Sequence, residues 1–565
     1  MSGVARPDAY TLIRIVLDPG SWKSWDEPTV DPAPPGSPYA EELAAARART
    51  PYDESVVTGE GLLGGRRVAV MACEFSFLAG SIGVAAAERL VRAVERATAE
   101  RLPLLAAPAS GGTRMQEGAL AFVQMIKISA AVSAHRAAGL PYIVYLRHPT
   151  TGGVFASWGS LGHVTAAEPG ALIGFLGPRV FESLHGYPFP EGVQVAENLF
   201  KHGLVDAVVS AASAREVAIR ALAVLCSSMD TRDAAPGEQQ RSLPRPPHHN
   251  ATATEEERGE AGRGEDGRGE DGRGEDGRGD DGRGEDGREE GGHGEGGPAW
   301  RVEPEDRVAE VGAWEAISRS RRDDRPGVKA LLKLGASDVT PLNGTGAGEN
   351  DPGLLLALAR FGRAPAVVLG QDRRQSAGRH LGPAGLRVAR RGMHLASELG
   401  LPLVTVIDTA GAALSRTAEE GGLAAEIARA LTTLVSLNTP TVCLILGEGA
   451  GGGALALLPT DRVLCAQHGW LSPLSPEGAS AILYRTIDFA PEIAKAQGVQ
   501  ARDLRRDGIV DRVIPEFPDA AYEPQAFCER VGATIEHEIL GLMGSPPEDR
   551  LATRLARYRY LGTPT

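Results

Sequence analysis

The sequence predicts an α/β protein built from two tandem copies of one strand–turn–helix unit. Short apolar runs alternate with helix-like segments of about 15 to 20 residues, in the same order on both sides of a charged central segment. Glycines recur at matching places: Gly111 and Gly411 are 300 positions apart, and so are Gly153 and Gly453. Two unrelated domains would not keep such a spacing, so we infer an internal duplication.

In the first copy, buried strands lead into glycine turns and helices. Its expected elements are, in order, strand 67–72, helix 82–102, strand 103–108, helix 119–139, strand 142–146 and the glycine turn TGGVFAS at 151–157. The strands are apolar without polar alternation, which is typical of a sheet covered on both faces. The pair Gly111 and Gly112 comes soon after the second strand, so bare backbone is presented near the strand's end.

The second copy repeats this order. Its expected elements are strand 366–369, helix 384–400, strand 403–407, a turn at Gly411, helix 422–437, strand 441–446 and the glycine turn AGGGALALL at 450–458. Both copies close alike, with HGLVDAVV in the first and DGIVDRVI in the second. We expect the shared aspartates, Asp206 and Asp511, to brace the end of each repeat.

Residues 227–300 separate the two copies and differ from both in composition. This segment contains five tandem pentads, four GRGED and one GRGDD, and almost no apolar side chains. Such a composition cannot bury enough apolar surface to fold, so we expect a disordered linker. The expected domains are therefore 1–226 and 301–565. A charged segment that binds a partner is the alternative reading of the linker.

Composition argues against several classes of protein. The five cysteines stand singly, with no C-x-x-C pair, which argues against a zinc site or disulfide scaffold and favours a reducing cytoplasm. No signal peptide is recognisable, and no 18-residue apolar stretch predicts a membrane span. The formal charge is −14, of which residues 255–290 contribute −9 through 16 acidic residues and 7 arginines. We therefore expect a cytoplasmic protein without metal, membrane or nucleic-acid partners.

The glycine turns predict a site built from backbone amides. The first turn of a helix leaves its N–H groups unpaired, and glycine lets a substrate oxygen approach them. Such donors stabilise an oxygen that becomes negative during a reaction. Tight helix–strand packing is the alternative reason for a glycine pair. Ser110 stands in A-S-G-G rather than G-x-S-x-G, and GEGAGGGA lacks the Gly-Lys-Ser/Thr ending, so a serine hydrolase or a phosphate loop has little support.

Several long motifs resemble one enzyme family. LDPGSW, CEFSFLAGSIG and SGGTRMQEG are similar to the beta subunit of bacterial acetyl-CoA carboxylase carboxyltransferase. IDTAGA, GEGAGGGALAL and SPEGASAILYR are similar to its alpha subunit. The chain therefore resembles a beta–alpha fusion, and the match covers roughly residues 10–215 and 350–535.

The resemblance implies two tandem crotonase-like (ClpP/crotonase) domains that transfer a carboxyl group from carboxybiotin to acetyl-CoA. The product would be malonyl-CoA, for fatty acid or polyketide synthesis. In this family the first-half amides, here Gly111 and Gly112, hold the thioester enolate of acyl-CoA. The second-half amides, here Gly452 and Gly453, hold the ureido oxygen of biotin. Carboxybiotin that has released carbon dioxide takes the acyl α-proton, so the protein needs no general base.

The resemblance also places a loop beside coenzyme A. Its residues here are Phe75, Gly80, Ser81 and Gly83, with plain core packing as the alternative for Phe75. Arg114 is expected to meet a phosphate of acyl-CoA or to pair with Glu117.

Motifs that the chain lacks indicate which separate partners it needs and where it differs from the family pattern. It has no Met-Lys-Met biotin-attachment segment and no phosphate loop, which implies a separate biotin carboxyl carrier protein and a separate biotin carboxylase. The family also implies a homodimer. No cysteine precedes Cys73, so the zinc ribbon of many beta subunits is absent. Ala79, Ala410 and Ala450 stand where the family usually has other small residues, which puts the acyl-chain preference in doubt.

Three alternatives remain open from the sequence. The acceptor could be propionyl-CoA or another acyl-CoA, since one methylene changes binding by only about 1 to 3 kcal/mol. The fold also hosts acyl-CoA decarboxylases, hydratases and isomerases, which usually need a positioned carboxylate. A non-catalytic carboxylase assembly subunit is the third alternative.

Overall fold

The computed structural model describes residues 6–30, 32–227, 311–373 and 380–562. We call the described residues up to 227 the first repeat and those from 311 the second repeat. The predicted linker, 227–300, lies outside the described residues except for Ser227. Both repeats belong to one unit by their contacts.

The first repeat is built on a seven-stranded sheet with the order β1-β2-β3-β4-β5-β7-β9. The strands are β1 (Lys23–Ser24), β2 (Val56–Leu63), β3 (Arg66–Cys73), β4 (Leu104–Ala107), β5 (Tyr142–Leu146), β7 (Val164–Ala167) and β9 (Ala207–Val208). Strands β1 to β3 pair antiparallel, and β3 to β9 pair parallel. Two further strands, β6 (Thr150–Thr151) and β8 (Ile173–Gly174), form a small parallel sheet of their own.

The second repeat has the same sheet order. Its strands are β10 (Ser337–Leu342), β11 (Leu354–Phe361), β12 (Ala364–Gln371), β13 (Leu403–Thr409), β14 (Thr441–Ala450), β15 (Arg462–Ala466) and β17 (Arg512–Ile514), with β16 (Trp470–Ser472) paired to β14. The first three are antiparallel neighbours and the rest pair parallel. The predicted class, α/β with two tandem crotonase-like domains, is confirmed.

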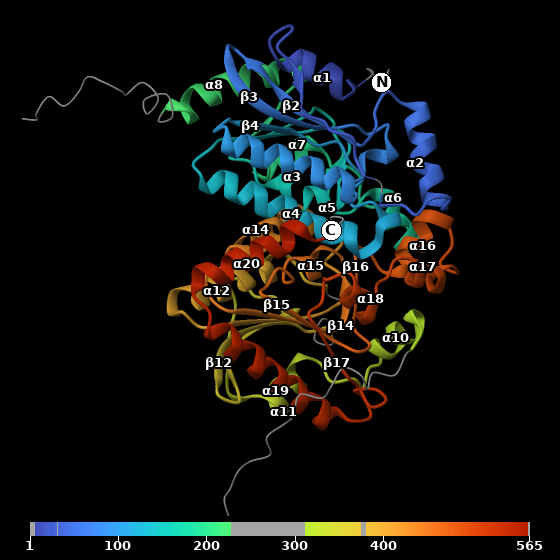
Figure 1. Cartoon of the computed structure of the whole chain (residues 1–565), viewed down its shortest axis with the longest axis vertical. Helices are drawn as coiled ribbons and strands as arrows, with labels where there is room; N and C mark the ends of the chain where they lie inside the picture. Colours follow the sequence, from blue (N-terminus) through green and yellow to red (C-terminus); the bar gives the residue numbers. More distant parts are fainter. Residues whose placement is uncertain (1–5, 31, 228–310, 374–379, 563–565) are drawn as a thin grey trace, which may run out of the picture. The chain divides into compact units, whose positions relative to one another are not determined.

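Helices pack against both sheets (Figure 1). The long helices beside the sheets are α3 (Val84–Ala99) and α4 (Gly118–Ala137) in the first repeat and α12 (Pro383–Leu399) and α14 (Leu423–Val435) in the second. The remaining first-repeat helices are α1 (Ala9–Val16), α2 (Pro38–Arg49), α5 (Gly152–Phe155), α6 (Pro178–His185), α7 (Ala196–Lys201) and α8 (Ala211–Leu225). Those of the second repeat are α10 (Ala313–Ser320), α11 (Val328–Gly335), α13 (Arg416–Glu420), α15 (Gly451–Leu455), α16 (Pro476–Tyr484), α17 (Ala490–Ala496), α18 (Ala501–Arg506), α19 (Pro524–Met543) and α20 (Pro547–Tyr560).

The duplication is confirmed, with a spacing one residue shorter than the glycine pattern suggested. Gly112 has φ +109° and Gly411 has φ +138°, and each donates its N–H to the hydroxyl two residues earlier, at 3.0 and 3.1 Å. Gly152 and Gly451 match likewise, with φ +64° and +65°. Equivalent glycines are therefore 299 positions apart (411 − 112 and 451 − 152). Adjacent glycines allow two alignments, and only the backbone conformation separates them.

The shared aspartates brace the repeats as predicted. Asp206 accepts a hydrogen bond from the N–H of Thr165 at 2.7 Å, and Asp511 accepts one from the N–H of Val463 at 2.7 Å. Each carboxylate thus ties the last parallel strand of its sheet to the neighbouring strand.

The two repeats share a boundary, which we call the seam. One hydrophobic cluster contains Phe122 on α4 together with Ile427 on α14. Arg559 of α20 forms ion pairs with Glu88 and Glu95 of α3, at 2.9 and 2.6 Å. Polar and apolar contacts therefore both cross the seam.

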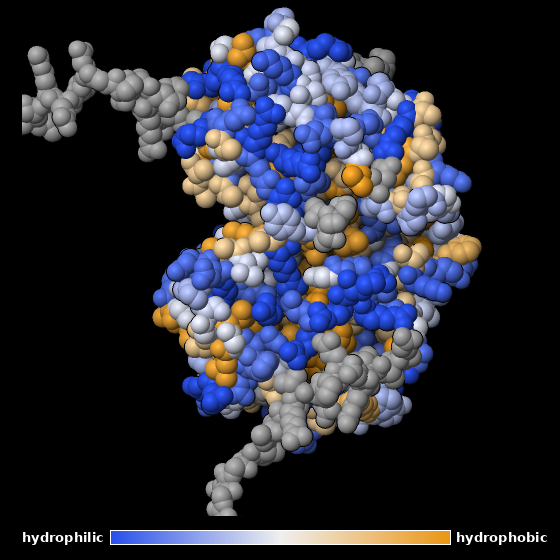
Figure 2. Space-filling model, in the orientation of Figure 1, coloured by the Kyte–Doolittle hydropathy of each residue, from blue (hydrophilic) through white to orange (hydrophobic). Residues whose placement is uncertain are grey.

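The surface is mainly hydrophilic, and the most apolar long helix is buried. Figure 2 shows mainly hydrophilic side chains over both repeats, with hydrophobic ones in small groups. Among the described residues, one helical stretch, Met115–Ala137, is long and apolar enough to cross a membrane, and 72% of its most apolar window is buried inside the protein. That burial is what a core helix requires, so the stretch gives only weak support for a membrane span.

Candidate functional site

A cavity of about 280 Å³ lies at the seam, and we call it the seam cavity. Both repeats contribute to its lining. The lining residues are Thr113, Phe122, Gly152, Gly153, Ala156, Phe175, Leu176, His380, Ala410, Gly411, Ala412, Leu414, Ala450, Gly451, Gly452, Leu455, Pro473, Leu474 and Ser475. Equivalent glycine turns of the two repeats thus meet at one space.

Both turns begin a short helix at the cavity. Gly152 and Gly153 open α5, and Gly451 and Gly452 open α15. The left-handed φ angles at Gly152 and Gly451 favour glycine because a Cβ is strained there. Gly152 donates its N–H to the carbonyl of Phe175 at 2.9 Å. The N–H groups of Gly153 and Gly452 have no hydrogen-bond partner among the described residues.

Neither Gly153 nor Gly452 has room for a side chain. A Cβ on Gly153 would lie 2.7 Å from Oγ1 of Thr113, and a Cβ on Gly452 would lie 2.9 Å from Cε2 of Phe175. The Thr113 hydroxyl is itself buried and has no partner within the described part of the chain. Thr113 is a site residue that sequence reasoning missed, because a threonine after a glycine pair carries no signal of its own.

The predicted first-half donors lie beside the cavity, with their amides engaged. Gly111 donates its N–H to the carbonyl of Ala79 at 2.9 Å, and Gly112 donates its N–H to Oγ of Ser110 at 3.0 Å. Neither glycine lines the seam cavity, although Thr113 directly after them does. Their role as donors to a substrate stays a prediction.

The predicted second-half donors divide in a similar way. Gly452 lines the seam cavity, and Gly453 does not. The carbonyl of Gly453 accepts a hydrogen bond from Nε2 of Gln371 at 2.7 Å, which ties the start of α15 to strand β12.

The residues predicted to contact acyl-CoA lie in and around one loop of the first repeat, outside the lining of the seam cavity. Phe75 is 40% exposed, so core packing does not account for it. A Cβ on Gly80 would collide with the carbonyl of Ala109, and a Cβ on Gly83 would collide with the carboxylate of Glu117. Packing alone therefore explains these two glycines.

Arg114 is enclosed rather than open to a phosphate. Its side chain is 1% exposed and forms ion pairs with Glu54 and, at 3.7 Å, with Glu117. It also donates from Nε to Oγ of Ser81 at 3.2 Å and from Nη2 to the Ser81 carbonyl at 2.8 Å. Burial alone would lower the pKa of Arg114, but the charge of Glu54 raises it above its ordinary value. Arg114 thus holds the Ser81 loop in place, and direct contact with acyl-CoA stays a prediction.

The seam cavity has little acid–base chemistry of its own. Among the described lining residues, His380 alone has an ionisable side chain. The others are glycines, small or apolar residues, and the hydroxyl residues Thr113 and Ser475. Such a lining suits a reaction assisted by backbone donors and poorly suits one that needs a catalytic carboxylate.

One buried cluster in the second repeat has the spacing of a metal site. His468, Glu516 and Asp519 bring their ligand atoms within 4.8 Å of one another. The guanidinium of Arg325 already occupies this group, at 2.5 Å from Glu516 and 3.4 Å from Asp519. Although burial opposes it, that cation lowers the pKa of Glu516, so the cluster is a neutralised structural network.

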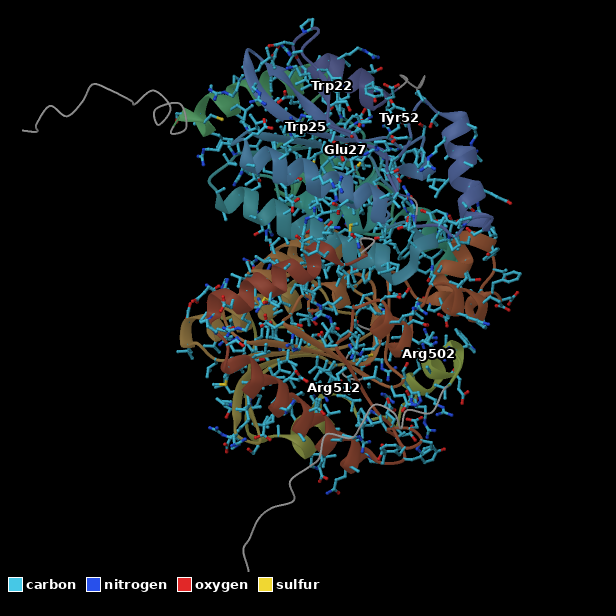
Figure 3. The ribbon with its side chains drawn as sticks, in the orientation of Figure 1. Trp22, Trp25, Glu27, Tyr52, Arg502 and Arg512 are labelled. Carbon is cyan, nitrogen blue, oxygen red and sulfur yellow. The ribbon has the colours of Figure 1, made fainter. Side chains whose placement is uncertain are left out.

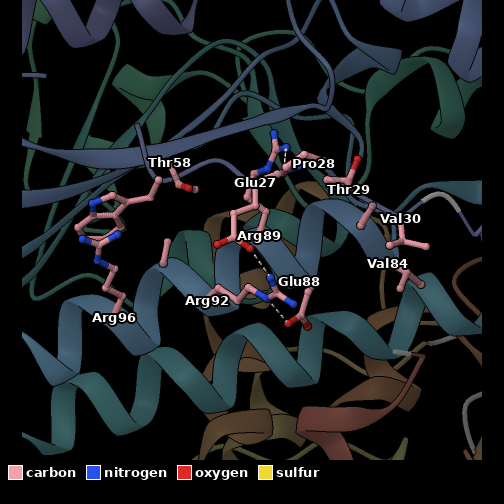
Figure 4. A pocket seen from close by; sticks show the side chains of 13 residues that line it. Glu27, Pro28, Thr29, Val30, Thr58, Val84, Glu88, Arg89, Arg92 and Arg96 are labelled. Carbon is pink, nitrogen blue, oxygen red and sulfur yellow. Dashed lines mark hydrogen bonds and ion pairs between the residues drawn. The ribbon is translucent and has the colours of Figure 1, made fainter. Parts of the chain in front are cut away.

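A second cavity, of about 270 Å³, lies in the first repeat between α3 and residues 25–30 (Figures 3 and 4). Its arginines all have carboxylate partners, in the lining or next to it. Arg92 contacts both Glu27 and Glu88 at 2.8 Å, and Arg96 lies over the ring of Trp25 at 4.3 Å. Because these cations are already satisfied, the seam cavity is the better candidate site.

Glu419 of α13 is buried at the seam, and its pKa is raised to about 7 because burial disfavours the charged form. Folded Glu419 therefore keeps a proton that the unfolded chain releases above its ordinary pKa of 4.5. This group's contribution to stability is complete below pH 4.5 and is lost as the pH rises to about 7.

We expect Glu419→Gln to raise the thermal unfolding midpoint relative to the native chain at pH 8 and not at pH 5. The full effect is on the order of 3 kcal/mol, from about 1.4 kcal/mol per pKa unit. Midpoints of both proteins, measured by calorimetry at the two pH values, check this. The same difference at both pH values would contradict it.

Comparisons with known proteins give matches over both repeats. Residues 12–260 match the family model of the carboxyl transferase domain, and residues 301–562 match that of acetyl co-enzyme A carboxylase carboxyltransferase-like proteins. The chain is 54% identical over 555 residues to a Mycobacterium tuberculosis protein named probable biotin-dependent acyl-coenzyme A carboxylase beta3 subunit, with 98% of each chain covered.

A further relative and a solved structure are also similar. The acetyl-coenzyme A carboxylase carboxyl transferase subunits beta/alpha of Salinispora arenicola are 36% identical over 570 residues, covering 99% of this chain and 91% of the relative. A crystal structure of transcarboxylase 12S with methylmalonyl-coenzyme A and methylmalonic acid bound is 18% identical, with a TM-score of 0.34, 96% of this chain covered and 91% of the solved chain.

Proposed function

Because this chain belongs to the carboxyltransferase family of biotin-dependent acyl-CoA carboxylases, we propose that it transfers a carboxyl group from carboxybiotin to acetyl-CoA, forming malonyl-CoA. One observation carries the site assignment. The amides of Gly153 and Gly452, one from each repeat, have no partner within the described part of the chain and belong to residues that line the same cavity. Two oxygens that gain negative charge during carboxyl transfer need two such sets of donors.

The residues at the seam cavity fit both reactants. Gly153, with Gly111 and Gly112 behind it, supports the thioester oxygen of acyl-CoA. Gly452, with Gly453 behind it, supports the ureido oxygen of biotin. Each missing donor of this kind typically costs about 10²- to 10³-fold in rate. The amides of Gly111 and Gly112 already donate hydrogen bonds within the protein, so Gly153 is the first-repeat glycine whose amide would bind the thioester oxygen directly.

Proton transfer is consistent with the cavity lining. Carboxybiotin supplies the carboxyl group and, once that group has left, the base for the acyl α-proton. The chain then has to orient the two reactants and exclude water, which apolar side chains such as Phe122, Phe175 and Leu414 can do. A hydratase of the same fold would need a carboxylate at this place, and the described lining has none.

The wider assignment follows from the family. Biotin is carried on a separate biotin carboxyl carrier protein and is carboxylated by a separate biotin carboxylase, and this chain acts as a homodimer in the cytoplasm. The product serves fatty acid or polyketide synthesis. Propionyl-CoA is the second candidate acceptor, because apolar side chains dominate the cavity walls and leave its acyl preference open.

The function is tested by carboxylation of acetyl-CoA and propionyl-CoA with the full chain, biotin carboxylase, carrier protein, ATP and labelled bicarbonate. We expect labelled malonyl-CoA and a higher kcat/KM for acetyl-CoA than for propionyl-CoA. Carrier without biotin is the control. Binding of coenzyme A without any turnover would contradict the proposal and favour a non-catalytic assembly subunit.

A further inference from the structure

A carboxyl group of the second repeat binds the backbone of the first repeat beside the seam cavity. Glu419 accepts hydrogen bonds from the N–H of Phe175, at 2.8 Å through Oε1 and 3.1 Å through Oε2. It also accepts one from Nε2 of Gln194 at 2.6 Å. Glu419 is 8% exposed, and within the described residues its oxygens accept from neutral N–H donors and form no ion pair.

The segment held in this way forms part of the cavity wall. Phe175 and Leu176 both line the seam cavity, and Nε2 of Gln194 donates to the carbonyl of Leu176 at 2.7 Å as well. The carbonyl of Phe175 accepts the N–H of Gly152, so the same residue fixes the start of α5.

Phe175 also contacts the opposite glycine turn. A Cβ built on Gly452 would lie 2.9 Å from Cε2 and 3.1 Å from Cζ of the Phe175 ring, so the ring packs directly against this glycine. Phe175 therefore touches the turn of the second repeat through its ring and the turn of the first repeat through its backbone. A small displacement of Phe175 would alter the distance between the two sets of amide donors.

We propose that Glu419 is a positioning residue for carboxyl transfer, which sets the relative placement of the two glycine turns by holding the Phe175–Leu176 segment. This rests on the proposed function of the seam cavity. Glu419 acts through Phe175 and does not line the seam cavity itself. A displacement of about 1 Å between reacting groups can cost on the order of 10²-fold in rate.

The neighbouring glutamate provides a matched control. Glu420 lies on the same helix and also crosses the seam, with its Oε1 accepting from Nδ2 of Asn198 at 3.2 Å and its Oε2 3.7 Å from Nε2 of His202. Its hydrogen bonds and ion pairs within the described residues go to Asn198, His202 and Arg416, and none goes to Phe175 or Leu176. A role limited to joining the repeats would be shared by both glutamates, whereas a positioning role belongs to Glu419 alone.

The test compares Glu419→Ala, Glu419→Gln and Glu420→Ala in the full chain. We expect Glu419→Ala to lower kcat by about 10- to 100-fold, with KM for acyl-CoA changed by less than about threefold. Glu419→Gln keeps an acceptor for the Phe175 N–H, so its kcat should stay within about threefold of the native value. Glu420→Ala should keep the native kcat.

Hydrogen exchange of the peptide that contains Phe175 provides a readout independent of turnover. Exchange at this peptide should increase in Glu419→Ala and stay unchanged in Glu420→Ala. Native kcat in Glu419→Ala, or equal losses in the two alanine variants, would overturn the inference. If the native chain shows no carboxyl transfer at all, the proposed function fails, whereas unchanged exchange in Glu419→Ala refutes the anchoring of Phe175 alone.

Discussion

Replacing Gly153 by valine is expected to lower the rate of carboxyl transfer by at least about 10²-fold. A Cβ at this position would lie 2.7 Å from Oγ1 of Thr113 and 3.3 Å from Cγ of Met125, so the added side chain must displace its neighbours or enter the cavity. Either result keeps a thioester oxygen away from the amide. Steady-state carboxylation of acetyl-CoA measures the loss.

The matched control for this change is Gly541→Val. Gly541 lies on α19, is exposed, and has nothing within 4 Å of an added Cβ. Its valine variant should turn over at the native rate and unfold at nearly the native temperature. A Gly153→Val protein that is folded and fully active would remove Gly153 from the proposed site.

Replacing Arg114 by methionine is expected to cause the largest loss of stability. Arg114 and Glu54 are 1% and 0% exposed, so the change leaves a buried carboxylate without its partner. Breaking a buried pair in this way costs about 3 to 5 kcal/mol, or roughly 3 to 5 °C in the unfolding midpoint of a folded unit of this size. Differential scanning calorimetry of the full chain measures the shift.

Two further variants separate the ion pair from simple loss of a side chain. Arg114→Met combined with Glu54→Gln should recover part of the loss, because Glu54 is then no longer a buried carboxylate without a partner. Arg92→Met breaks ion pairs with Glu27 and Glu88, but the Arg92 side chain is 59% exposed and Glu88 keeps its pairs with Lys127 and Arg559, so the change should cost less than about 1 kcal/mol. A midpoint for Arg114→Met no lower than that for Arg92→Met would contradict the prediction.

The sequence predicts the buried strands better than the hairpin strands. Strands such as 441–446 are continuous apolar runs, and the structure places β14 there (Thr441–Ala450). Strand β2 (Val56–Leu63) escaped prediction because its sequence, VVTGEGLL, contains two glycines. A Cβ on Gly59 would lie 2.5 Å from Cη2 of Trp22, so those glycines depend on a segment that packs over the strand and that local sequence does not reveal.

The glycine turns were predictable, whereas the state of each amide was not. Adjacent glycines near a strand's end indicate that a ligand or another chain segment approaches the backbone closely, and this pattern predicted Gly111 and Gly452 as site residues. Whether an N–H remains available depends on distant contacts, such as the carbonyl of Ala79 that accepts from Gly111. The bond between Glu419 and Phe175 joins residues 244 positions apart, and no local pattern carries such information.

The ion pairs of α20 at the seam have a consequence for folding during synthesis. Arg559 is 464 residues beyond its partner Glu95, so the ribosome makes Arg559 long after the first repeat has emerged. The apolar face of α4 that packs on α14 likewise has no cover from the second repeat until α14 (Leu423–Val435) has been made. The nascent first repeat is therefore exposed to aggregation while the chain between the two helices is synthesised, and it should need chaperones during that interval.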